Sequence, residues 1–435
     1  RAAASANAAA PGVAPAAHPL VAASLALTVI NGGVIFGWPG LVGLLAQRGV
    51  MLSPAELGRM FTFGALAFSG TAPVSGAVVD QLGPRTASAL SGLLCVLAFA
   101  GLAVRTDAAG LTLAYAALSA GGFGGYLASL SLGNSHASRW HPPLLWPKQG
   151  AKIITTLSCL VDVSAITFVA LFATQRRLPT AACLASPFIF GGMAVATVML
   201  HLVLWRSWGR VMLPAAVSAT ARAEAAGSAG APALWAQLRS VHFAQVLCFA
   251  AVHSLACGHA LAHLPARVAA ASGGGGASLA EVASVLMTVG CLPAIPLVTR
   301  VLEVGLARAM TVVNGLGLLF VALSLVPVAL APLCSAFVFA AYRGLLYSTI
   351  NLFHARVFGP LIMGRTIGAM SVLSSAPLFF LQQPLFGGGV QFARAQRVLG
   401  GAVLLLAAST ELYSRRNAAR LRAAGPDGGA SSPAA

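Results

Sequence analysis

Charged residues are scarce in this chain of 435 residues. Asp, Glu, Lys and Arg together make up 8% of the sequence, and only 9 residues are acidic. A soluble globular protein carries roughly 25% charged residues. A soluble fold with so few charges could not hydrate its surface, so that class is excluded. We expect lipid to cover most of the chain.

Motifs for metal binding and for common hydrolytic chemistry are also lacking. The seven cysteines lie within or beside apolar runs, without CxxC or Cys/His metal spacing. HExxH and GxSxG motifs and paired intramembrane carboxylates are not found either. We therefore expect no metal, no cofactor and no enzymatic activity. A membrane enzyme or a non-transporting receptor is the competing class, although residues 206–240, the longest polar segment, are short for a receptor domain.

Long uncharged runs are what the sequence has in abundance. The chain is 58% hydrophobic and has a mean hydropathy of +0.86. A helix that crosses about 30 Å of hydrocarbon needs roughly 20 apolar residues, and on this criterion the sequence predicts twelve spans. They are Pro19–Gln47, Met60–Val79, Thr86–Val104, Ala108–Ser138, Ile153–Gln175, Leu178–Trp205, Val241–Leu264, Val282–Thr299, the two parts of Ala309–Tyr342 that Pro327 and Pro332 separate, Thr366–Ala393 and Val398–Tyr413.

The spans form two groups of six on either side of a polar segment, as an internal duplication would give. We expect a disordered N-terminal segment at 1–18, an N-terminal six-helix bundle at 19–205, a cytoplasmic inter-bundle loop at 206–240, a C-terminal six-helix bundle at 241–413 and a cytoplasmic tail at 414–435. The stretch Ser53-Pro54-Ala55-Glu56 predicts a capping box at the start of the second span.

The distribution of basic residues predicts the orientation in the membrane. The formal net charge is +17, but the charges punctuate the apolar runs instead of clustering on one soluble face, so nucleic acid is not an expected partner. With both termini in the cytoplasm, seventeen Lys and Arg residues lie on the cytoplasmic side and eight on the other, and Arg343 lies within a span. This asymmetry fits the positive-inside rule.

A charged motif follows the second span: Gly76-Ala-Val-Val-Asp80-Gln-Leu-Gly83-Pro-Arg85. It resembles the G-x-x-x-D-x-x-G-x-R loop of the major facilitator superfamily. The resemblance implies an all-α membrane protein with the major facilitator fold, in which twelve transmembrane helices form two bundles that transport a solute by alternating access.

The chemistry of this motif suits a gate on the cytoplasmic side. Gly76 allows two helices to approach closely. Asp80 is suited to accept the positive end of a neighbouring helix or an arginine. Gly83 makes the turn, and we expect Arg85 to pair across the two-helix elbow. Together these four residues would latch the cytoplasmic side in one state of the transport cycle.

Further segments resemble solute carrier family forty-three, the sodium-independent transporters of large neutral amino acids, and its protist and fungal relatives. They are Phe36-Gly-Trp38-Pro-Gly-Leu41, Gly121–Gly125, Asp162–Phe168, Arg343–Ser348 and Gly364–Gly368. The resemblance implies a monomeric amino-acid transporter, whose partners are its small-molecule substrate and the lipid bilayer. We expect the plasma membrane rather than an organelle membrane. The alternative is a carrier of the same fold for another small organic solute or anion, with or without proton coupling.

Two charges are expected near the middle of the membrane. Asp162 and Arg343 each lie about ten residues into a span, which at a rise of 1.5 Å is roughly 15 Å deep. A charge there costs several kcal/mol, so such residues usually pair or serve function. Arg343 and Asp162 would bind the carboxylate and ammonium groups of an amino acid, or would form a structural salt bridge between the halves. A third hypothesis gives Asp162 a role in proton coupling.

Other polar and aromatic residues within spans are candidates to line the substrate cavity, with packing between helices as the alternative for each. They are Asn31, Trp38, Tyr126 and Tyr347. His259 and His263 have the i, i+4 spacing of a metal pair, but no third ligand is evident, so we expect packing or cavity lining there.

Overall fold

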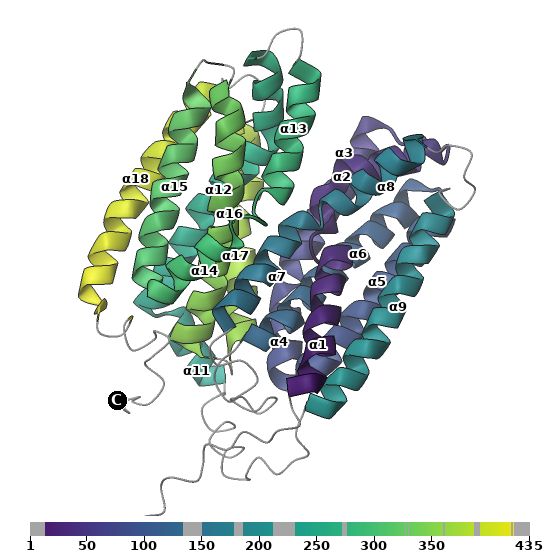
Figure 1. The fold of residues 1–435 in the computed structure, drawn as a ribbon, viewed down its shortest axis with the longest axis horizontal. Coiled ribbons are helices and arrows are strands. Elements are labelled where there is room, and N and C mark those ends of the chain that lie inside the picture. The colour runs from purple at the N-terminus through teal and green to yellow at the C-terminus, as the bar shows by residue number, and fades with distance from the viewer. Residues whose placement is uncertain are drawn as a thin grey trace, which may run out of the picture.

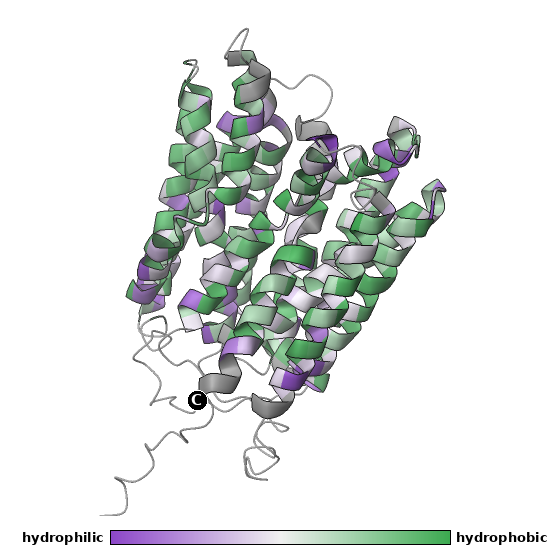
Figure 2. Cartoon of the chain, turned by 45° about the vertical axis from the view of Figure 1, so that its right-hand side comes forward, coloured by the Kyte–Doolittle hydropathy of each residue, from purple (hydrophilic) through white to green (hydrophobic). Residues whose placement is uncertain are grey.

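The computed structural model describes residues 14–133, 150–177, 186–211, 231–271, 276–326, 328, 330–359, 362–386, 392–418 and 421. The regular elements within these ranges are all helices. Figure 1 shows them as two bundles that lie side by side. Hydrophobic residues predominate along the middle of the helices, and hydrophilic residues gather mainly near the helix ends (Figure 2). The all-α architecture is therefore confirmed.

The N-terminal bundle contains the first six expected spans. Its helices are α1 (Ala14–Leu27), α2 (Trp38–Gln47), α3 (Pro54–Gly70), α4 (Ala72–Leu82), α5 (Pro84–Val104), α6 (Ala108–Leu130), α7 (Gly150–Val163), α8 (Ile166–Arg177) and α9 (Ser186–Val211), with a π-helical turn η1 (Thr28–Gly32) and a 3-10 turn η2 (Val34–Gly37) between α1 and α2, and a 3-10 turn η3 (Ser131–Gly133) after α6. Helix α1 begins at Ala14, inside the segment expected to be disordered; residues 1–13 lie outside the described ranges.

The C-terminal bundle contains the other six. Its helices are α12 (Val241–Ala271), α13 (Gly276–Val289), α14 (Ile295–Val304), α15 (Leu306–Leu325), α16 (Leu330–Phe353), α17 (Met363–Phe386) and α18 (Phe392–Arg416), with a π-helical turn η6 (His354–Phe358) after α16. The short helix α11 (Ala231–Leu238) precedes α12. The rest of the expected inter-bundle loop, 212–230, lies outside the described residues.

Each expected span corresponds to a helix or to a broken helix. Among the described residues, six helices are long and apolar enough to cross a membrane by themselves, and up to eight spans result if each strongly bent pair is one span. The other spans do not meet this criterion of length and apolar composition as single helices. Helix α6 is rich in glycine, the eighth span is divided into α13 and α14, and α18 carries several charges near its ends.

The first and fifth spans break where they touch each other. The first bends by 42° between His18–Gly32 and Ile35–Gln47, and the fifth by 40° between α7 and α8. In the break of the fifth span, the Ser164 hydroxyl donates to the Val161 carbonyl at 2.6 Å. A Cβ on Gly33 would lie 2.1 Å from that carbonyl oxygen, so only glycine permits this approach. The sequence predicted both spans as continuous helices.

Two helices of the N-terminal bundle, α3 and α6, begin with side-chain caps. The Ser53 hydroxyl accepts a bond from the Glu56 amide, and the Glu56 carboxylate accepts one from the Ser53 amide, which confirms the predicted capping box. Asp107 caps α6 by accepting a bond from the Gly110 amide at 2.8 Å. The Arg105 side chain, which bonds to the Asp107 carboxylate, lowers the pKa of Asp107 below its ordinary value, and the Gly110 amide adds to this effect.

The two bundles meet through a few helices. Helix α4 packs against α17, and α7 packs against α14 and α16. In Figure 1 the bundles lie closer together at the end that carries α4 and α11 than at the end that carries α3 and α13. The positive-inside count predicts that this closer end faces the cytoplasm, and it is termed the cytoplasmic end.

Candidate substrate site and cytoplasmic gate

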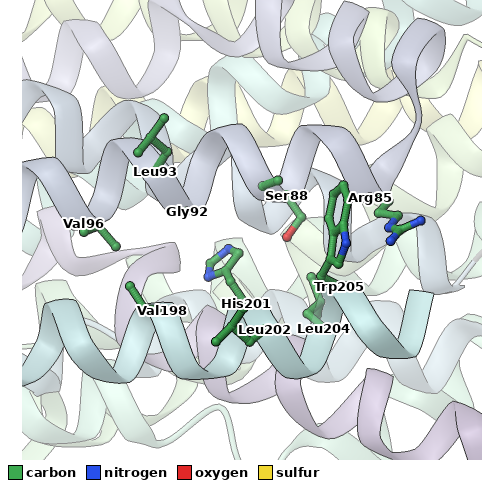
Figure 3. A pocket seen from close by; sticks show the side chains of 11 residues that line it. Arg85, Ser88, Gly92, Leu93, Val96, Val198, His201, Leu202, Leu204 and Trp205 are labelled. Carbon is green, nitrogen blue, oxygen red and sulfur yellow. The ribbon is translucent and has the colours of Figure 1, made fainter. Parts of the chain in front are cut away.

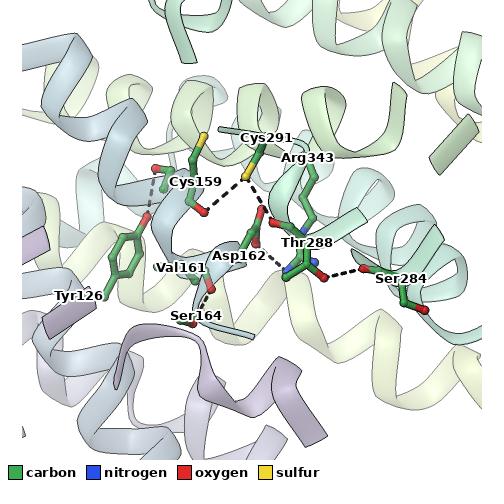
Figure 4. Close-up of polar contacts among 10 residues, drawn as sticks. Tyr126, Cys159, Val161, Asp162, Ser164, Ser284, Thr288, Cys291 and Arg343 are labelled. Atoms are coloured by element: carbon green, nitrogen blue, oxygen red, sulfur yellow. Dashed lines mark hydrogen bonds and ion pairs between the residues drawn. The ribbon is translucent and has the colours of Figure 1, made fainter. Parts of the chain in front are cut away.

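Asp162 and Arg343 form an ion pair between the two halves. The Arg343 Nη2 atom of α16 lies 2.9 Å from the Asp162 Oδ1 atom of α7, and the side chains are only 4% and 2% exposed (Figure 4). The Asp162 Oδ2 and Arg343 Nε atoms are also buried, but neither has a hydrogen-bond partner among the described residues. The pair thus keeps an unused acceptor and an unused donor.

Aromatic rings surround the arginine. The guanidinium carbon of Arg343 lies 4.6 Å from the centre of the Phe36 ring and 5.7 Å from that of Tyr347. Phe36 belongs to η2, at the break of the first span, so both halves contribute to this environment. Ring faces attract a cation, which offsets part of the cost of burying it. Tyr347 thus lies beside the central arginine, and its role in lining a substrate cavity stays a prediction.

A polar cluster joins the halves closer to the cytoplasmic end. The Asn351 side-chain amide of α16 donates to the Tyr126 hydroxyl at 2.7 Å and to the Ser158 hydroxyl at 3.1 Å. Tyr126 and Ser158 are themselves 3.2 Å apart. The sequence analysis named Tyr126 but missed its two partners. Helical spacing from the charged residues would have marked them only as polar residues on similar helix faces, because Ser158 is four positions before Asp162 and Asn351 is eight after Arg343.

The break in the eighth span packs beside the ion pair. The Cys291 thiol donates to the Cys159 carbonyl of α7 at 3.5 Å, as Figure 4 shows. Gly344 of α16 faces both cysteines, since a Cβ on it would lie 3.1 Å from the Cys159 sulfur. The close packing of α7, α16 and this break leaves little room for larger side chains around the central charges.

Asn31 and Trp38 make their described contacts within the N-terminal bundle. The Asn31 amide oxygen accepts a bond from the Thr197 hydroxyl at 3.4 Å. The Trp38 ring lies 5.6 Å from the Phe61 ring and 5.1 Å from the Tyr115 ring. These are the packing contacts of the alternative hypothesis, and a role of either residue in substrate binding stays a prediction.

Asp80 fastens the end of α4 to the start of α17. Its Oδ1 atom accepts a bond from the Gly364 amide at 3.0 Å, and its Oδ2 atom accepts bonds from the Arg365 amide at 2.9 Å and the Arg365 Nε at 3.3 Å. The first backbone amides of a helix have no partner within the helix, and these amides and the helix dipole favour a carboxylate there. Asp80 therefore contacts both partners that the motif suggested, a helix N-terminus and an arginine, and both belong to the other half.

Glycines make this contact possible. A Cβ on Gly76 would lie 2.0 Å from the Gly364 carbonyl oxygen, and one on Gly368 would lie 2.5 Å from the Ala72 carbonyl oxygen. Gly83 ends α4 with a φ of +89°, which favours glycine. Gly76 and Asp80 thus lie at the contact between α4 and α17, and Gly83 makes the turn after α4; the action of the motif as a latch stays a prediction.

Arg85 differs from the expectation. Its guanidinium lies 3.7 Å above the Trp205 ring of α9, within the same half. It forms no ion pair within the described residues, so the predicted pairing across the elbow is wrong for this structure. The physical reason is that the Asp80 carboxylate is already occupied by α17.

The buried histidines bond to neighbouring side chains. His253 contacts the Tyr342 hydroxyl and, at 2.9 Å, the Asn314 amide oxygen. His259 contacts the Gln396 amide at 3.0 Å, and its ring lies 4.7 Å from that of His263. In the part of the chain that the structure describes, no three His, Cys, Asp or Glu residues form a possible metal site.

Solved structures with the same arrangement are transporters of the major facilitator superfamily. The proton:xylose symporter XylE bound to 6-bromo-6-deoxy-D-glucose superposes with a TM-score of 0.63 and 12% identity, over 91% of this chain and 95% of that one. FucP in the outward conformation gives 0.59 and 12%, over 89% and 98%. The human organic anion transporter MFSD10 (TETRAN) gives 0.56 and 17%, over 90% and 99%.

No protein-family profile matches the chain, and no curated protein matches its sequence. At 12% to 17% identity, the structural likeness establishes the fold alone. The chain is thus an all-helical membrane protein with the major facilitator fold, as the loop after the second span predicted.

Proposed function

We propose that this protein transports a small organic solute by alternating access and binds it between the bundles, beside Asp162 and Arg343. The supporting observation is the pair of unused polar atoms, Asp162 Oδ2 and Arg343 Nε, at a buried contact between the halves. A buried polar atom without a partner is costly, so a polar solute that bonds to it gains affinity. Transporters with inverted repeats bind substrate near the midplane at such an interface.

The contacts between the halves support one state of that cycle. Asp80 with α17, and Asn351 with Tyr126 and Ser158, hold the cytoplasmic end together. Solute would then enter from the opposite side. Release into the cytoplasm requires these same bonds to break, and the outward conformation of FucP supports the assignment by analogy of fold.

An amino acid suits the charges of the pair. Its carboxylate would bond to Arg343 and its ammonium group to Asp162, so each charge exchanges one opposite partner for another. This exchange avoids leaving an isolated buried charge, which is strongly unfavourable. The rings of Phe36 and Tyr347 provide apolar surface for a large neutral side chain.

A sugar or an organic anion, with a coupling proton on Asp162, is the second candidate. It is supported by the solved structures of similar fold, whose names include a proton:xylose symporter and an organic anion transporter. In this mode Arg343 would bind the solute, and protonation of Asp162 would free the arginine from its partner.

Uptake into proteoliposomes tests both candidates. Labelled amino acids, sugars and organic anions are offered with and without a pH gradient. Amino-acid uptake that is independent of the gradient supports the first candidate, and gradient-driven sugar or anion uptake supports the second. Binding or product formation without uptake would instead favour the receptor or enzyme class.

We propose that the protein is a monomer in the plasma membrane. Measurement of its size in detergent and microscopy of a fluorescent fusion would check the two parts of this proposal.

Charge variants then test the role of the pair. Asp162→Asn should abolish uptake of the identified solute. Exchange of the two charges, Asp162→Arg with Arg343→Asp, should not restore uptake, because the ends of a bound zwitterion would face the wrong charges. Restored uptake in the exchanged variant would show that the pair is structural and does not recognise the solute.

A further inference from the structure

A groove of about 270 Å³ lies between α5 and α9 on the N-terminal bundle, away from the contact between the halves (Figure 3). Gly92 helps to form it, because its missing side chain leaves the space into which the His201 ring extends. A Cβ on Gly92 would lie 2.5 Å from the His201 Nε2 atom. The proposed transport function assigns no role to this groove.

The groove faces lipid and changes its chemistry with depth. Leu93 and Leu202 at its edge are 56% and 52% exposed, as expected of side chains that contact hydrocarbon. Arg85 and Trp205 lie at the cytoplasmic end, whereas Val96 lies eleven residues further along α5. At 1.5 Å per residue this separation is about 16 Å, roughly half of a hydrocarbon layer of about 30 Å. The groove thus extends through one leaflet.

The cytoplasmic end of the groove carries a cation, Arg85, that forms no ion pair with any residue that the structure describes. The Arg85 Nε atom is buried and has no hydrogen-bond partner among the described residues. No acidic residue lines the groove. The His201 ring, by contrast, bonds to the backbone at Thr197 and Ser88. The Arg85 guanidinium stacks on the Trp205 ring, which fixes its position at this end of the groove.

We infer that this groove binds one phospholipid of the cytoplasmic leaflet with an anionic headgroup. Its phosphate bonds to Arg85 at the membrane surface, and an acyl chain follows the apolar wall along Leu93, Val96 and Val198. The positive charge of Arg85 favours an anionic headgroup, and the length of the apolar wall matches an acyl chain in one leaflet. The exposed Arg206 beside Trp205 adds positive potential that favours an anionic over a zwitterionic lipid.

The test is a lipid titration of the purified protein in detergent. Phosphatidylglycerol and phosphatidylcholine with identical acyl chains are added, and the melting temperature is followed, because a ligand of the folded state stabilises it by mass action. We expect phosphatidylglycerol to act at lower concentration. Arg85→Gln should raise the phosphatidylglycerol midpoint about fivefold, toward that of phosphatidylcholine, which corresponds to about 1 kcal/mol for one basic residue at the surface.

Two further variants separate a site from a general surface effect. Arg206→Gln is the matched control, because it removes a neighbouring charge that does not line the groove, and it should change the midpoint less than Arg85→Gln. Val198→Trp should fill the apolar wall and weaken both lipids while leaving Arg85 in place. Three results would overturn the inference. They are equal midpoints for the two lipids in the unmodified protein, a phosphatidylglycerol midpoint that rises as much in Arg206→Gln as in Arg85→Gln, and unchanged midpoints in Val198→Trp.

Discussion

The hydroxyl groups of Ser69 and Ser375 lie 3.0 Å apart and join α3 of one half to α17 of the other. Both helices belong to spans that also meet at Asp80. The Ser69–Ser375 contact should therefore exist only while the cytoplasmic end is closed, which makes it a reporter of the state that the structure shows.

Cysteines at these two positions should form a disulfide when a mild oxidant is added. Ser69→Cys with Ser375→Cys should cross-link readily, because the two side-chain oxygens are 3.0 Å apart and sulfur atoms at these positions need only a small movement to form the ~2 Å sulfur–sulfur bond. Cross-linking should stop uptake, and a reductant should restore it. The two single variants control for the seven native cysteines. Full uptake by the cross-linked protein would contradict the proposed alternating movement.

The Asp80 contact should set the balance between states. Asp80→Asn removes a negative charge that accepts bonds from the Gly364 and Arg365 amides. Hydrogen bonds to a charged group contribute about 1.5–3 kcal/mol, so the closed state should lose at least about tenfold in relative population. In the Ser69/Ser375 cysteine background, cross-linking should slow accordingly.

The matched control is Asp107→Asn, which makes the same chemical change at an exposed helix cap distant from α17. Its cross-linking rate should equal that of the parent. Equal rates in both variants and the parent would show that Asp80 does not stabilise the closed end.

Gly76→Ala should act on the same equilibrium by crowding. The added methyl group would lie 2.0 Å from the Gly364 carbonyl oxygen, so α4 and α17 must separate. We expect slower cross-linking and reduced uptake with an unchanged helical content by circular dichroism. Gly70→Ala, in the same span but with no atom within 4 Å of the new methyl group, is the control and should behave as the parent does.

The central ion pair should show strong energetic coupling. Asp162→Asn leaves Arg343 buried without its counter-charge, which should cost about 3–5 kcal/mol of stability. Asp162→Asn with Arg343→Gln should recover much of this loss, because no lone charge stays buried. Thermal unfolding in detergent measures the stability of Asp162→Asn, of Arg343→Gln and of the double variant. A stability loss in the double variant that equals the sum of the two single losses would contradict a coupled pair.

The exposed pair of Glu411 and Arg415 provides the comparison. Its side chains are 51% and 77% exposed, although the atoms are 2.7 Å apart. Exposed pairs contribute little, so Glu411→Gln should leave the melting temperature nearly unchanged. The contrast would show that burial, rather than proximity, makes the central pair important.

Composition was sufficient to locate most spans, and a sequence resemblance located the Asp80 motif. Uncharged runs located the helices because hydrocarbon excludes charge from their length. The Asp80 motif was recognisable because it resembles the loop signature of the major facilitator superfamily. Asp162 and Arg343 were recognisable as rare charges deep within spans.

The breaks and the cross-half partners were not recognisable in this way. A glycine such as Gly33 has the same letter whether it packs within a helix or against the Val161 carbonyl. Asn351 and Ser158 are common polar residues, and only the approach of α16 to α7 makes them partners of Tyr126. The predicted pairing of Arg85 was wrong because the start of α17, about 280 positions later in the sequence, occupies the Asp80 carboxylate.

The mutual neutralisation of Asp162 and Arg343 has an electrical consequence. One elementary charge that crosses a membrane potential of 100 mV gains or loses about 2.3 kcal/mol. A carrier with a lone arginine at its centre would feel that voltage each time it turned. The two opposite charges lie 2.9 Å apart, so this pair carries no net charge. In the proposed transport cycle, voltage should therefore neither drive nor oppose the return of the empty protein through this pair.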